Sequence, residues 1–496
     1  MNGSEDGLSL ELMEAEVTGV HIHSRRYGAV VSNGTVNFND CTFSSSPVSG
    51  AGISLDRPST IAFTRCLIVG NKYGIISKSM QPRLNVTDCT FRNNSASAIH
   101  LVHSYIVGSV TAATVLLRRN LFTDNLRAVH VDQKVANPIK VEAVDNVFES
   151  VSVNPGVSHT GVSVSGVYVN LAAAGNQAHV VLRRNSFRNL PHSAVSISRC
   201  YRYPRLQANQ TNTVVGNNFT SVSQTVVVIQ CAETATTLIQ KNTFLQNRMD
   251  AGPSCLSVSS RAVDSRLSVE LRIDNNEFRD NSGTHIASLT SARSSFSPEA
   301  ISNISEFVSN TLVDNSARNS TVYSEYSGLP MHFNTFSNQR IRFELRVGFP
   351  SDQTANCTYN WWGVGTADDI AARIFDHSDM AGVGSVIYVP FLNSSQFNCD
   401  ELSDCSGHGS CIYHDTCRCD VGWSGVDCSS YSCLGVYDCS NRGQCVGPNL
   451  CRCDTGWLQP DCSRASCIQQ NNCSSRGVCS LPNVWVKRKR KVLPEP

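Results

Sequence analysis

The chain has 496 residues, of which 22 are cysteine and only 16% are Asp, Glu, Lys or Arg, against roughly 25% in an average soluble domain. Its formal net charge is +1, and five of its basic residues lie together between Lys487 and Lys491. A near-neutral body of this kind excludes nucleic acid and an anionic membrane surface as main partners, because both require a concentrated basic patch.

The N-terminal segment from Met1 to Asp6 carries no basic residue and no apolar stretch follows it, so the sequence contains no secretory signal. No run approaches the roughly 18 apolar residues of a transmembrane helix. The cysteine content nevertheless predicts a disulfide scaffold, which forms in an oxidising compartment. We therefore expect an extracellular or cell-surface protein whose signal peptide and any membrane anchor lie outside this sequence.

Eleven Asn-X-Ser/Thr sequons agree with this location, although such triplets also arise by chance in a chain rich in Asn and Ser. Two of them start at Asn2 and Asn472. The nine others are the candidate glycosylation sites, at Asn33, Asn85, Asn93, Asn209, Asn218, Asn303, Asn319, Asn356 and Asn393.

A short motif recurs between residues 41 and 336. It consists of Asn or Cys, any residue, and Phe or another apolar residue, and successive copies are 23 to 39 residues apart. The third residues of the eleven copies are Phe43, Ile68, Phe91, Phe122, Phe148, Phe187, Phe219, Phe244, Phe278, Leu312 and Phe336. A nearly fixed minimum spacing with a variable excess is typical of a solenoid coil that carries loop insertions.

A second apolar run follows each motif about eight residues later, such as Ala98-Ile99 and Ala128-Val129. These runs are short, β-branched and separated by Asn, Ser and Gly, which favours strands over helices. Two or three short strands per coil predict an all-β parallel β-helix, in which each strand pairs with its copies about 4.8 Å away. A leucine-rich solenoid lacks its regular Leu spacing here, and propeller blades exceed the shortest repeat.

Equivalent residues stack on each other in a parallel β-helix. We therefore expect an internal ladder of Phe side chains and a ladder of Asn side chains at a turn, where Asn adopts the left-handed conformation. Stacked amides attract and stacked like charges repel, which explains the low charge content.

Several cysteines occupy equivalent positions of the repeat. Cys41, Cys66 and Cys89 fill the Asn position in three consecutive coils, and a reduced sulfur ladder is favoured over a disulfide because three thiols cannot all pair. Cys200 and Cys231 match in register and are the better candidates for a disulfide between coils.

Glycan-active enzymes on a β-helix need carboxylates that converge from neighbouring coils, about 5 to 10 Å apart for hydrolysis. Asp88, Asp145 and Asp274 precede the Asn or Cys position in non-adjacent coils, so we do not expect them to converge. Asp368-Asp369 lies beyond the repeat, and Gly407-His408-Gly409, which resembles a polygalacturonase motif, lies in the cysteine-rich region. No catalytic residue is therefore predicted.

Histidines and arginines on the coils are the remaining candidates for chemistry. His100 and His130 are expected to stack on one face as a solvent-exposed pair, with ligand binding or proton transfer as the alternative. Arg118-Arg119 and Arg183-Arg184 are expected to be solvated residues at strand ends rather than sugar clamps.

The repeat ends between residues 356 and 392. This segment contains Trp361-Trp362 and a short helical stretch that includes Asp369. A solenoid needs its last coil covered, so these apolar residues predict a cap. Stacking of the Trp pair on a sugar is the alternative.

The closing segment also carries a family resemblance. Its turn Asn360-Trp361-Trp362-Gly363, the stretch Arg373–Asp376 and the ending Tyr388–Leu392 resemble the extracellular right-handed β-helix units of the bark beetle family, also called Anakonda. The resemblance covers about residues 30 to 395, and the repeat itself is shared by many pectin-lyase-like folds. It implies a large single-pass membrane protein of epithelial cell corners. The scavenger-receptor and lectin-like modules of that family are absent from this sequence.

Fifteen cysteines lie in the 81 residues from Cys399 to Cys479. Six from Cys399 to Cys428 are separated by five, five, five, one and eight residues, and six from Cys433 to Cys462 repeat these gaps 34 residues later. A third copy opens at Cys467 but has only three cysteines. Six cysteines allow fifteen connectivities, so the spacing alone does not select one.

The two complete copies resemble tenascin-type epidermal-growth-factor-like (EGF-like) modules, through Cys-Ser-Gly-His-Gly-Ser-Cys and Cys-Arg-Cys-Asp-Val-Gly-Trp-Ser-Gly-Val-Asp-Cys. That family pairs the first cysteine with the third, the second with the fourth and the fifth with the sixth. The resemblance implies the disulfides Cys399–Cys411, Cys405–Cys417, Cys419–Cys428, Cys433–Cys445, Cys439–Cys451 and Cys453–Cys462, and Cys467–Cys479 in the incomplete copy.

Metal ions are the alternative for these cysteines. Cys417-Arg418-Cys419 leaves one residue between the thiols, whereas zinc ligands are usually separated by two to four. The segment Asp400–Asp404 does not reproduce the acidic run of calcium-binding EGF-like modules. No metal site and no cofactor is therefore predicted.

The chain turns basic after the incomplete module. Residues 487–491 read literally as a nuclear signal, but a truncated or mis-joined chain is the better interpretation in a disulfide protein. The predicted domains are β-helix repeats at 1–355, their closing segment at 356–395, EGF-like modules at 396–430 and 431–464, an incomplete module at 465–479 and a disordered basic tail at 480–496.

These features predict a non-catalytic extracellular adhesion or scaffold protein, of the cell-junction or matrix type. Its β-helix would present a rigid surface to extracellular proteins or glycans. The alternatives are a glycan-active β-helix enzyme, either a lyase or a hydrolase, and a secreted receptor ligand.

Overall fold

The computed structural model describes residues 6–487 apart from the segments 12–13, 46–49, 57–58, 78–82, 104–112, 134–137, 152–164, 172–177, 199–208, 232–233, 250–253, 261–268, 292–304, 395–398, 414–415, 459, 467–476 and 483. The chain divides into two compact units, Met1–Asn393 and Ser394–Pro496. The first is a β-helix and the second is a series of small disulfide-rich modules.

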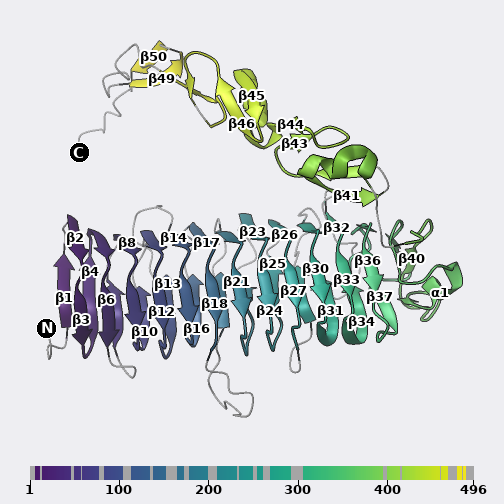
Figure 1. The fold of residues 1–496 in the computed structure, drawn as a ribbon, viewed down its shortest axis with the longest axis horizontal. Coiled ribbons are helices and arrows are strands. Elements are labelled where there is room, and N and C mark those ends of the chain that lie inside the picture. The colour runs from purple at the N-terminus through teal and green to yellow at the C-terminus, as the bar shows by residue number, and fades with distance from the viewer. Residues whose placement is uncertain are drawn as a thin grey trace, which may run out of the picture. The chain divides into compact units, whose positions relative to one another are not determined.

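The first unit is a right-handed parallel β-helix made of three parallel sheets, A, B and C (Figure 1). The chain passes through sheets B, C and A in turn, so that a strand pairs with the strand three places later. Sheet A contains β1 (Asp6–Glu11), β4 (Tyr27–Ser32), β7 (Ala51–Leu55), β10 (Tyr73–Ser77), β13 (Ser97–His103), β16 (Arg127–Gln133), β19 (Ser165–Leu171), β22 (Val195–Ser198), β25 (Val227–Cys231), β28 (Ser254–Ser260), β31 (Ser282–Ser291), β34 (Ser316–Ser324), β37 (Phe343–Val347) and β39 (Ile374–Phe375).

Sheets B and C have twelve strands each. Sheet B contains β2 (Glu14–Thr18), β5 (Thr35–Asn39), β8 (Thr60–Thr64), β11 (Arg83–Thr87), β14 (Ala113–Arg118), β17 (Ile139–Val144), β20 (Ala178–Arg183), β23 (Asn209–Val215), β26 (Thr234–Gln240), β29 (Glu270–Asp274), β32 (Glu306–Val308) and β35 (Met331–His332). Sheet C contains β3 (His21–Ser24), β6 (Thr42–Ser45), β9 (Leu67–Val69), β12 (Thr90–Arg92), β15 (Leu121–Thr123), β18 (Val147–Glu149), β21 (Ser186–Arg188), β24 (Asn218–Thr220), β27 (Thr243–Leu245), β30 (Glu277–Arg279), β33 (Thr311–Val313) and β36 (Thr335–Ser337).

The predicted Phe ladder is confirmed and runs through the core from sheet C. Ring centroids of neighbouring coils from Phe91 to Phe278 lie 4.5 to 5.0 Å apart, and all these rings are buried. One further coil precedes the first motif of the sequence, with Ile22 in register with Phe43. That coil lacks both the Asn or Cys and the Phe, so the motif did not reveal it.

The predicted Asn ladder lies at the turn between sheets B and C. The backbone N–H and the Nδ2 of each Asn both donate to Oδ1 of the Asn in the next coil, at 2.8 to 3.1 Å. Its members are Asn120, Asn146, Asn185, Asn217, Asn242, Asn276, Asn310, Asn334 and Asn360, all buried. The ladder therefore satisfies a buried row of polar groups that would otherwise destabilise the core.

The conformation expected for this ladder was wrong. The left-handed residue is the one before each ladder position, for example Arg119 before Asn120, and not the Asn itself. The reason is that the Asn is fixed by its hydrogen bonds on both sides of the row, so the preceding residue makes the bend. Residues with positive φ at this place include Asp, Arg and Lys, whose side chains project outward.

A second Asn ladder, which we did not predict, lies at the turn between sheets C and A. It contains Asn71, Asn94 and Asn125, and later Asn247, Asn281, Asn315 and Asn338, joined by the same amide hydrogen bonds. Leu190 and Val222 interrupt it. Its signal in the sequence is an Asn three residues after the Phe in most of these coils.

Both rows end against the closing segment. Trp362 is fully buried and stacks on Phe336 with 4.9 Å between ring centroids. This side chain therefore closes the Phe ladder and is not available to a sugar. The carboxylate of the buried Glu344 accepts hydrogen bonds from the N–H and Nδ2 of Asn338 and from Arg373. Burial raises its pKa.

Short elements complete the first unit. Helix α1 (Ala367–Ala371) starts at the N-cap Thr366, whose hydroxyl accepts a hydrogen bond from the N–H of Asp369. Strands β38 (Thr354–Asn356) and β40 (Ser385–Ile387) pair in parallel beyond the last coil.

The second unit repeats one plan, a 3-10 segment followed by short hairpins. Its elements are η1 (Asp400–Gly407), β41 (Gly409–Tyr413), β42 (Thr416–Cys419), β43 (Trp423–Ser424), β44 (Ser430–Tyr431), η2 (Leu434–Asn441), β45 (Gly443–Gly447), β46 (Leu450–Cys453), β47 (Trp457–Leu458), β48 (Arg464–Ala465), β49 (Gly477–Leu481) and β50 (Val484–Lys487). The expectation of disorder from residue 480 was wrong for β49 and β50, which form an antiparallel hairpin. The rest of the basic tail lies outside the described residues.

Candidate functional site

Aspartates beside the first Asn ladder pair with arginines of the next coil. Arg65 makes a bidentate ion pair with Asp40, with distances of 2.7 and 2.8 Å, and the pairs Arg119–Asp88 and Arg184–Asp145 repeat it. In each pair the guanidinium holds the pKa of the carboxyl below its ordinary value. Arg119 and Arg184 are therefore ion-paired, and not simply solvated as expected.

The other acids named from the sequence do not join these pairs. Asp274 is buried at the end of β29, two residues before the ladder residue Asn276, and accepts a hydrogen bond from Gln240. Asp368 and Asp369 lie in the first turn of α1. Among the carboxylates named from the sequence, the described residues therefore contain no convergent pair.

The two histidines lie in an aromatic column on the outer face of sheet A. Tyr73, His100, His130 and Tyr168 follow each other with centroid separations of 5.1, 4.5 and 5.0 Å. All four are half-buried, which corrects the expectation of a fully exposed pair. Burial lowers the pKa of His130 to about 4, with a smaller contribution from His100.

A second aromatic cluster lies on the same sheet near its C-terminal end. His285 stacks on Tyr323 at 5.1 Å, and Arg346 packs over the ring of Phe375 at 4.0 Å. Burial lowers the pKa of His285 to about 4 and raises that of Tyr323 to about 12, and the Tyr323 hydroxyl donates to Glu325. Sequence reasoning missed this cluster because its members have no common motif.

A polar groove of about 870 Å³ lies over the turn between sheets C and A, and we call it the C–A groove. Its charged lining residues are Arg248, Asp280, Asp314 and Arg340, and the rest of the lining is mainly Ser, Asn and Gln. Five consecutive coils contribute to it, from Ser221 to Arg340. Sequence reasoning missed it because the groove depends on differences in turn length between coils.

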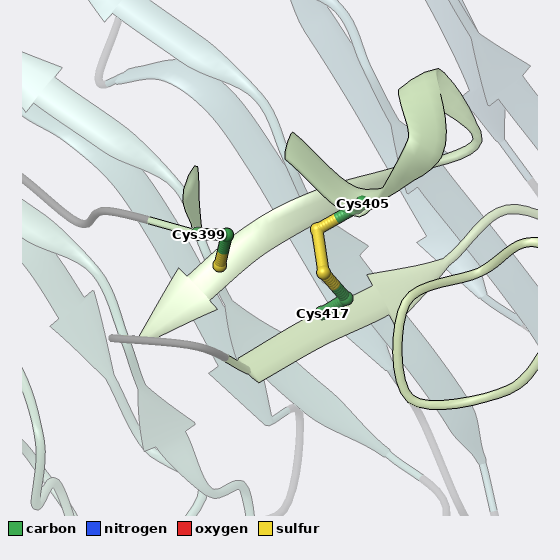
Figure 2. Close-up of side chains that lie close together, drawn as sticks. All are labelled: Cys399, Cys405 and Cys417. Carbon is green, nitrogen blue, oxygen red and sulfur yellow. A yellow bond between two sulfur atoms is a disulfide. The ribbon is translucent and has the colours of Figure 1, made fainter. Parts of the chain in front are cut away.

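The twelve cysteines from Cys399 to Cys462 form six disulfides, on the same pairs that the EGF-like resemblance implies. Figure 2 shows the Cys405–Cys417 bond between η1 and β42, with Cys399 beside it. Three sulfurs in each module lie within 4.8 Å of one another, as in a metal site. All of them are bonded in disulfides, so they are not thiolate ligands.

A cation or imidazole packs on a tryptophan in each of these modules. His408 stacks on Trp423 with 3.4 Å between ring centroids, and Arg442, 34 residues later, lies 3.9 Å above the ring of Trp457. The histidine of the polygalacturonase-like motif is thus part of the packing of a module.

The cysteines outside these six disulfides include buried free thiols and two predicted pairs that are only partly described. Cys41, Cys66, Cys89, Cys255 and Cys357 are buried free thiols, and the backbone N–H groups of Cys41 and Cys66 donate to the sulfur of the next coil. The proposed Cys200–Cys231 bond depends on Cys200, which lies outside the described residues. Cys479 is disulfide-bonded, but its expected partner Cys467 also lies outside them.

The candidate glycosylation sites are mostly at the surface. Asn33 is half-buried, and the exposed ones are Asn85, Asn93, Asn218, Asn319, Asn356 and Asn393. Asn303 and the side chain of Asn209 lie outside the described residues.

Comparison with known proteins supports the fold. Residues 6–166 match a family model described as the right handed beta helix region, which covers about a third of the chain. No curated protein and no solved structure gives a significant match. Among the described residues, no helix is long and apolar enough to cross a membrane.

Proposed function

We propose that this chain is a non-catalytic extracellular scaffold or adhesion protein. Its β-helix presents an outer surface to glycans or proteins, and its C-terminal modules belong to the EGF-like class. The observation that carries the proposal is the pairing of Asp40, Asp88 and Asp145 with arginines, which keeps these three carboxylates ionised and occupied. Hydrolysis of a glycan requires one protonated and one ionised carboxyl group at the same site.

The interior supports a structural role. Two rows of buried amides and a stack of Phe rings fix each coil on the next. The outward side chains of successive coils therefore have a fixed spacing. Glu344, whose pKa is raised, is enclosed by Asn338, Thr321 and Arg373 and is not accessible to a substrate. Six disulfides suggest an oxidising compartment.

A glycan-active enzyme is the second candidate. Asp280 and Asp314 occupy the same place in adjacent coils of the C–A groove, as catalytic carboxylates would. However, Arg279 forms an ion pair with Asp314 at 3.2 Å, so one of the two carboxylates already has a partner within the chain.

Two assays test the proposal together: binding of protein-coated beads to surfaces, and depolymerisation of polysaccharides. Beads coated with the chain, produced through a secretory pathway, should bind to glycan-coated or cell-derived surfaces. The same protein should release neither new reducing ends nor unsaturated uronates from a panel of acidic and neutral polysaccharides. Depolymerisation that is lost in Asp280→Asn would establish the enzyme instead.

A further inference from the structure

Two columns of outward side chains form the C–A groove. Ser221, Gln246, Asp280 and Asp314 form the first column, and each has a φ of 53° to 55° that directs it away from the core. Ser223, Arg248, Ser282 and Ser316 form the second column, two residues further along each coil. The buried second ladder, including Asn247, Asn281 and Asn315, lies between the columns and fixes their separation.

The depression has a simple origin in turn length. Only two residues separate β30 from β31, and only two separate β33 from β34. The connections on either side are longer, since residues 246–253 join β27 to β28 and residues 338–342 join β36 to β37. Two short turns therefore form the floor, and Arg340 comes from the longer turn on one side. The four coils that form the two columns are spaced by about 4.8 Å and extend over about 14 Å, and Arg340 lies on a fifth coil beside them.

The charges in the groove differ from the ion pairs beside the first Asn ladder. Arg248, Arg340 and Asp280 are exposed, and none of them forms an ion pair or a side-chain hydrogen bond with another described residue. By contrast, Arg65, Arg119 and Arg184 are each held by a carboxylate in bidentate geometry. Two guanidinium groups are thus available to a ligand in a concave site.

We propose that the C–A groove binds a segment of an acidic glycan, with Arg248 and Arg340 bound to its carboxylate or sulfate groups. This inference rests on the proposed function and specifies its ligand and its site. Arginine recognises such planar or tetrahedral anions through paired N–H donors. The hydroxyls of Ser223, Ser282 and Ser316 and the carboxylate of Asp280 can bond the sugar hydroxyls.

The composition of the groove favours this ligand over other polymers. Among the described lining residues, Val222 is the one apolar side chain and is buried, so an amphipathic helix would find no pocket for its anchors. Asp280 and Asp314 would repel the closely spaced phosphates of a nucleic acid. A glycan with many hydroxyls and widely spaced negative charges can place its anions on the arginines and its hydroxyls on the acids.

The test measures binding of three oligosaccharides of equal length by calorimetry. A hyaluronan octasaccharide carries carboxylates only, a chondroitin sulfate octasaccharide carries both anions, and maltooctaose carries none. We expect at least one acidic probe to bind and maltooctaose not to bind. The double variant R248Q/R340Q should raise the Kd for the acidic probe by about tenfold or more.

The matched control is R83Q/R92Q, which removes two exposed arginines that also lack partners among the described residues but lie outside the groove. Its Kd should stay within about twofold of the unsubstituted chain, as expected for a change of net charge alone. Binding of chondroitin sulfate alone would assign the recognised anion to sulfate, and equal binding would assign it to the carboxylate.

Two results would overturn the inference: no binding of either acidic probe, or unchanged affinity in R248Q/R340Q with an intact circular dichroism spectrum. The mass of each probe after incubation distinguishes failure of the groove as a binding site from failure of the proposed non-catalytic function. A shortened probe contradicts the non-catalytic role but leaves the groove as the binding site. An intact probe that does not bind contradicts the groove alone.

Discussion

Single side chains decide whether a buried row of polar groups is stabilising. Asn217 accepts from the N–H and Nδ2 of Asn185, donates to Oδ1 of Asn242, and donates at 3.0 Å to the carbonyl of Leu182. Each of these groups is buried, so every bond that is removed leaves a polar atom that water does not reach. The ladder is therefore sensitive to substitution at each position.

We predict that Asn217→Ala destabilises the β-helix by about 3 to 5 kcal/mol, because it leaves several buried donors and acceptors unsatisfied. The midpoint of urea unfolding, followed by circular dichroism, measures this loss. Asn37→Ala is the matched control, since Asn37 is exposed on β5 and its change should stay within about 0.5 kcal/mol. Equal midpoints for the two variants would contradict the importance of the ladder.

The histidines of sheet A predict a dependence of stability on pH. The folded pKa of His130 and of His285 is about 4, below the ordinary value of 6.5. The unfolded chain therefore takes up protons first, and stability should fall as the pH decreases from about 6.5 to 4, by on the order of 1 to 3 kcal/mol for each histidine. The urea midpoint at pH 7.0 and pH 4.5 tests this expectation.

His130→Gln isolates the contribution of one ring. Its urea midpoint should change less between pH 7.0 and pH 4.5 than that of the unsubstituted chain, whereas His21→Gln, at an exposed position, should keep the full change. An unaltered pH dependence in His130→Gln would show that this histidine does not contribute.

At the scale of strands, the stability of the core depends on how the buried side chains of each row pack on one another. Strand β21 has three residues, and only Phe187 among them is buried, between Phe148 and Phe219 at 4.6 and 5.0 Å. Leu312 and Ile68 occupy this row in other coils, so the row accepts branched aliphatic side chains.

Phe187→Ala should destabilise the β-helix by about 3 to 5 kcal/mol, since it removes a large buried side chain and leaves a cavity. Phe187→Leu, which imitates the native Leu312, should cost less than about 1.5 kcal/mol. Thermal unfolding of both variants measures the difference. A loss with Leu as large as that with Ala would indicate that ring stacking, and not volume, stabilises the row.

The same rows explain how much the sequence revealed. The Phe and first Asn rows were predictable because their residues are two positions apart in the chain and belong to a motif that recurs in eleven copies. The second Asn row escaped because Leu190 and Val222 interrupt it, and the first coil escaped because Ile22 replaces the Phe. The ion pair between Asp88 and Arg119 was not predictable, because these residues are 31 positions apart in loops of variable length. The C–A groove likewise results from turn lengths, which no local motif records, and its Arg248 and Arg340 lack partners only with respect to the part of the chain that the structure describes.

At the scale of the whole molecule, two kinds of stabilisation are divided between the two units. The β-helix has a continuous apolar core made largely of Phe, Ile, Val and Leu from successive coils, and Cys41, Cys66, Cys89, Cys255 and Cys357 are free thiols within it. The modules have cores made mainly of cystine, with Trp423 and Trp457 packed against them. A module of about 34 residues cannot bury enough apolar area to fold without such bonds.

Reduction should therefore unfold the modules and leave the β-helix intact. Treatment with a phosphine reductant, followed by limited proteolysis and mass spectrometry, should give cleavage between residues 399 and 466 while fragments of the β-helix persist. The β-sheet signal in circular dichroism should keep most of its amplitude, because the 38 strands of sheets A, B and C contain no disulfide among the described residues. The unreduced chain is the control and should resist cleavage in the modules. Simultaneous loss of both units on reduction would show that the β-helix also depends on a disulfide, and Cys200 and Cys231 would then be the residues to replace.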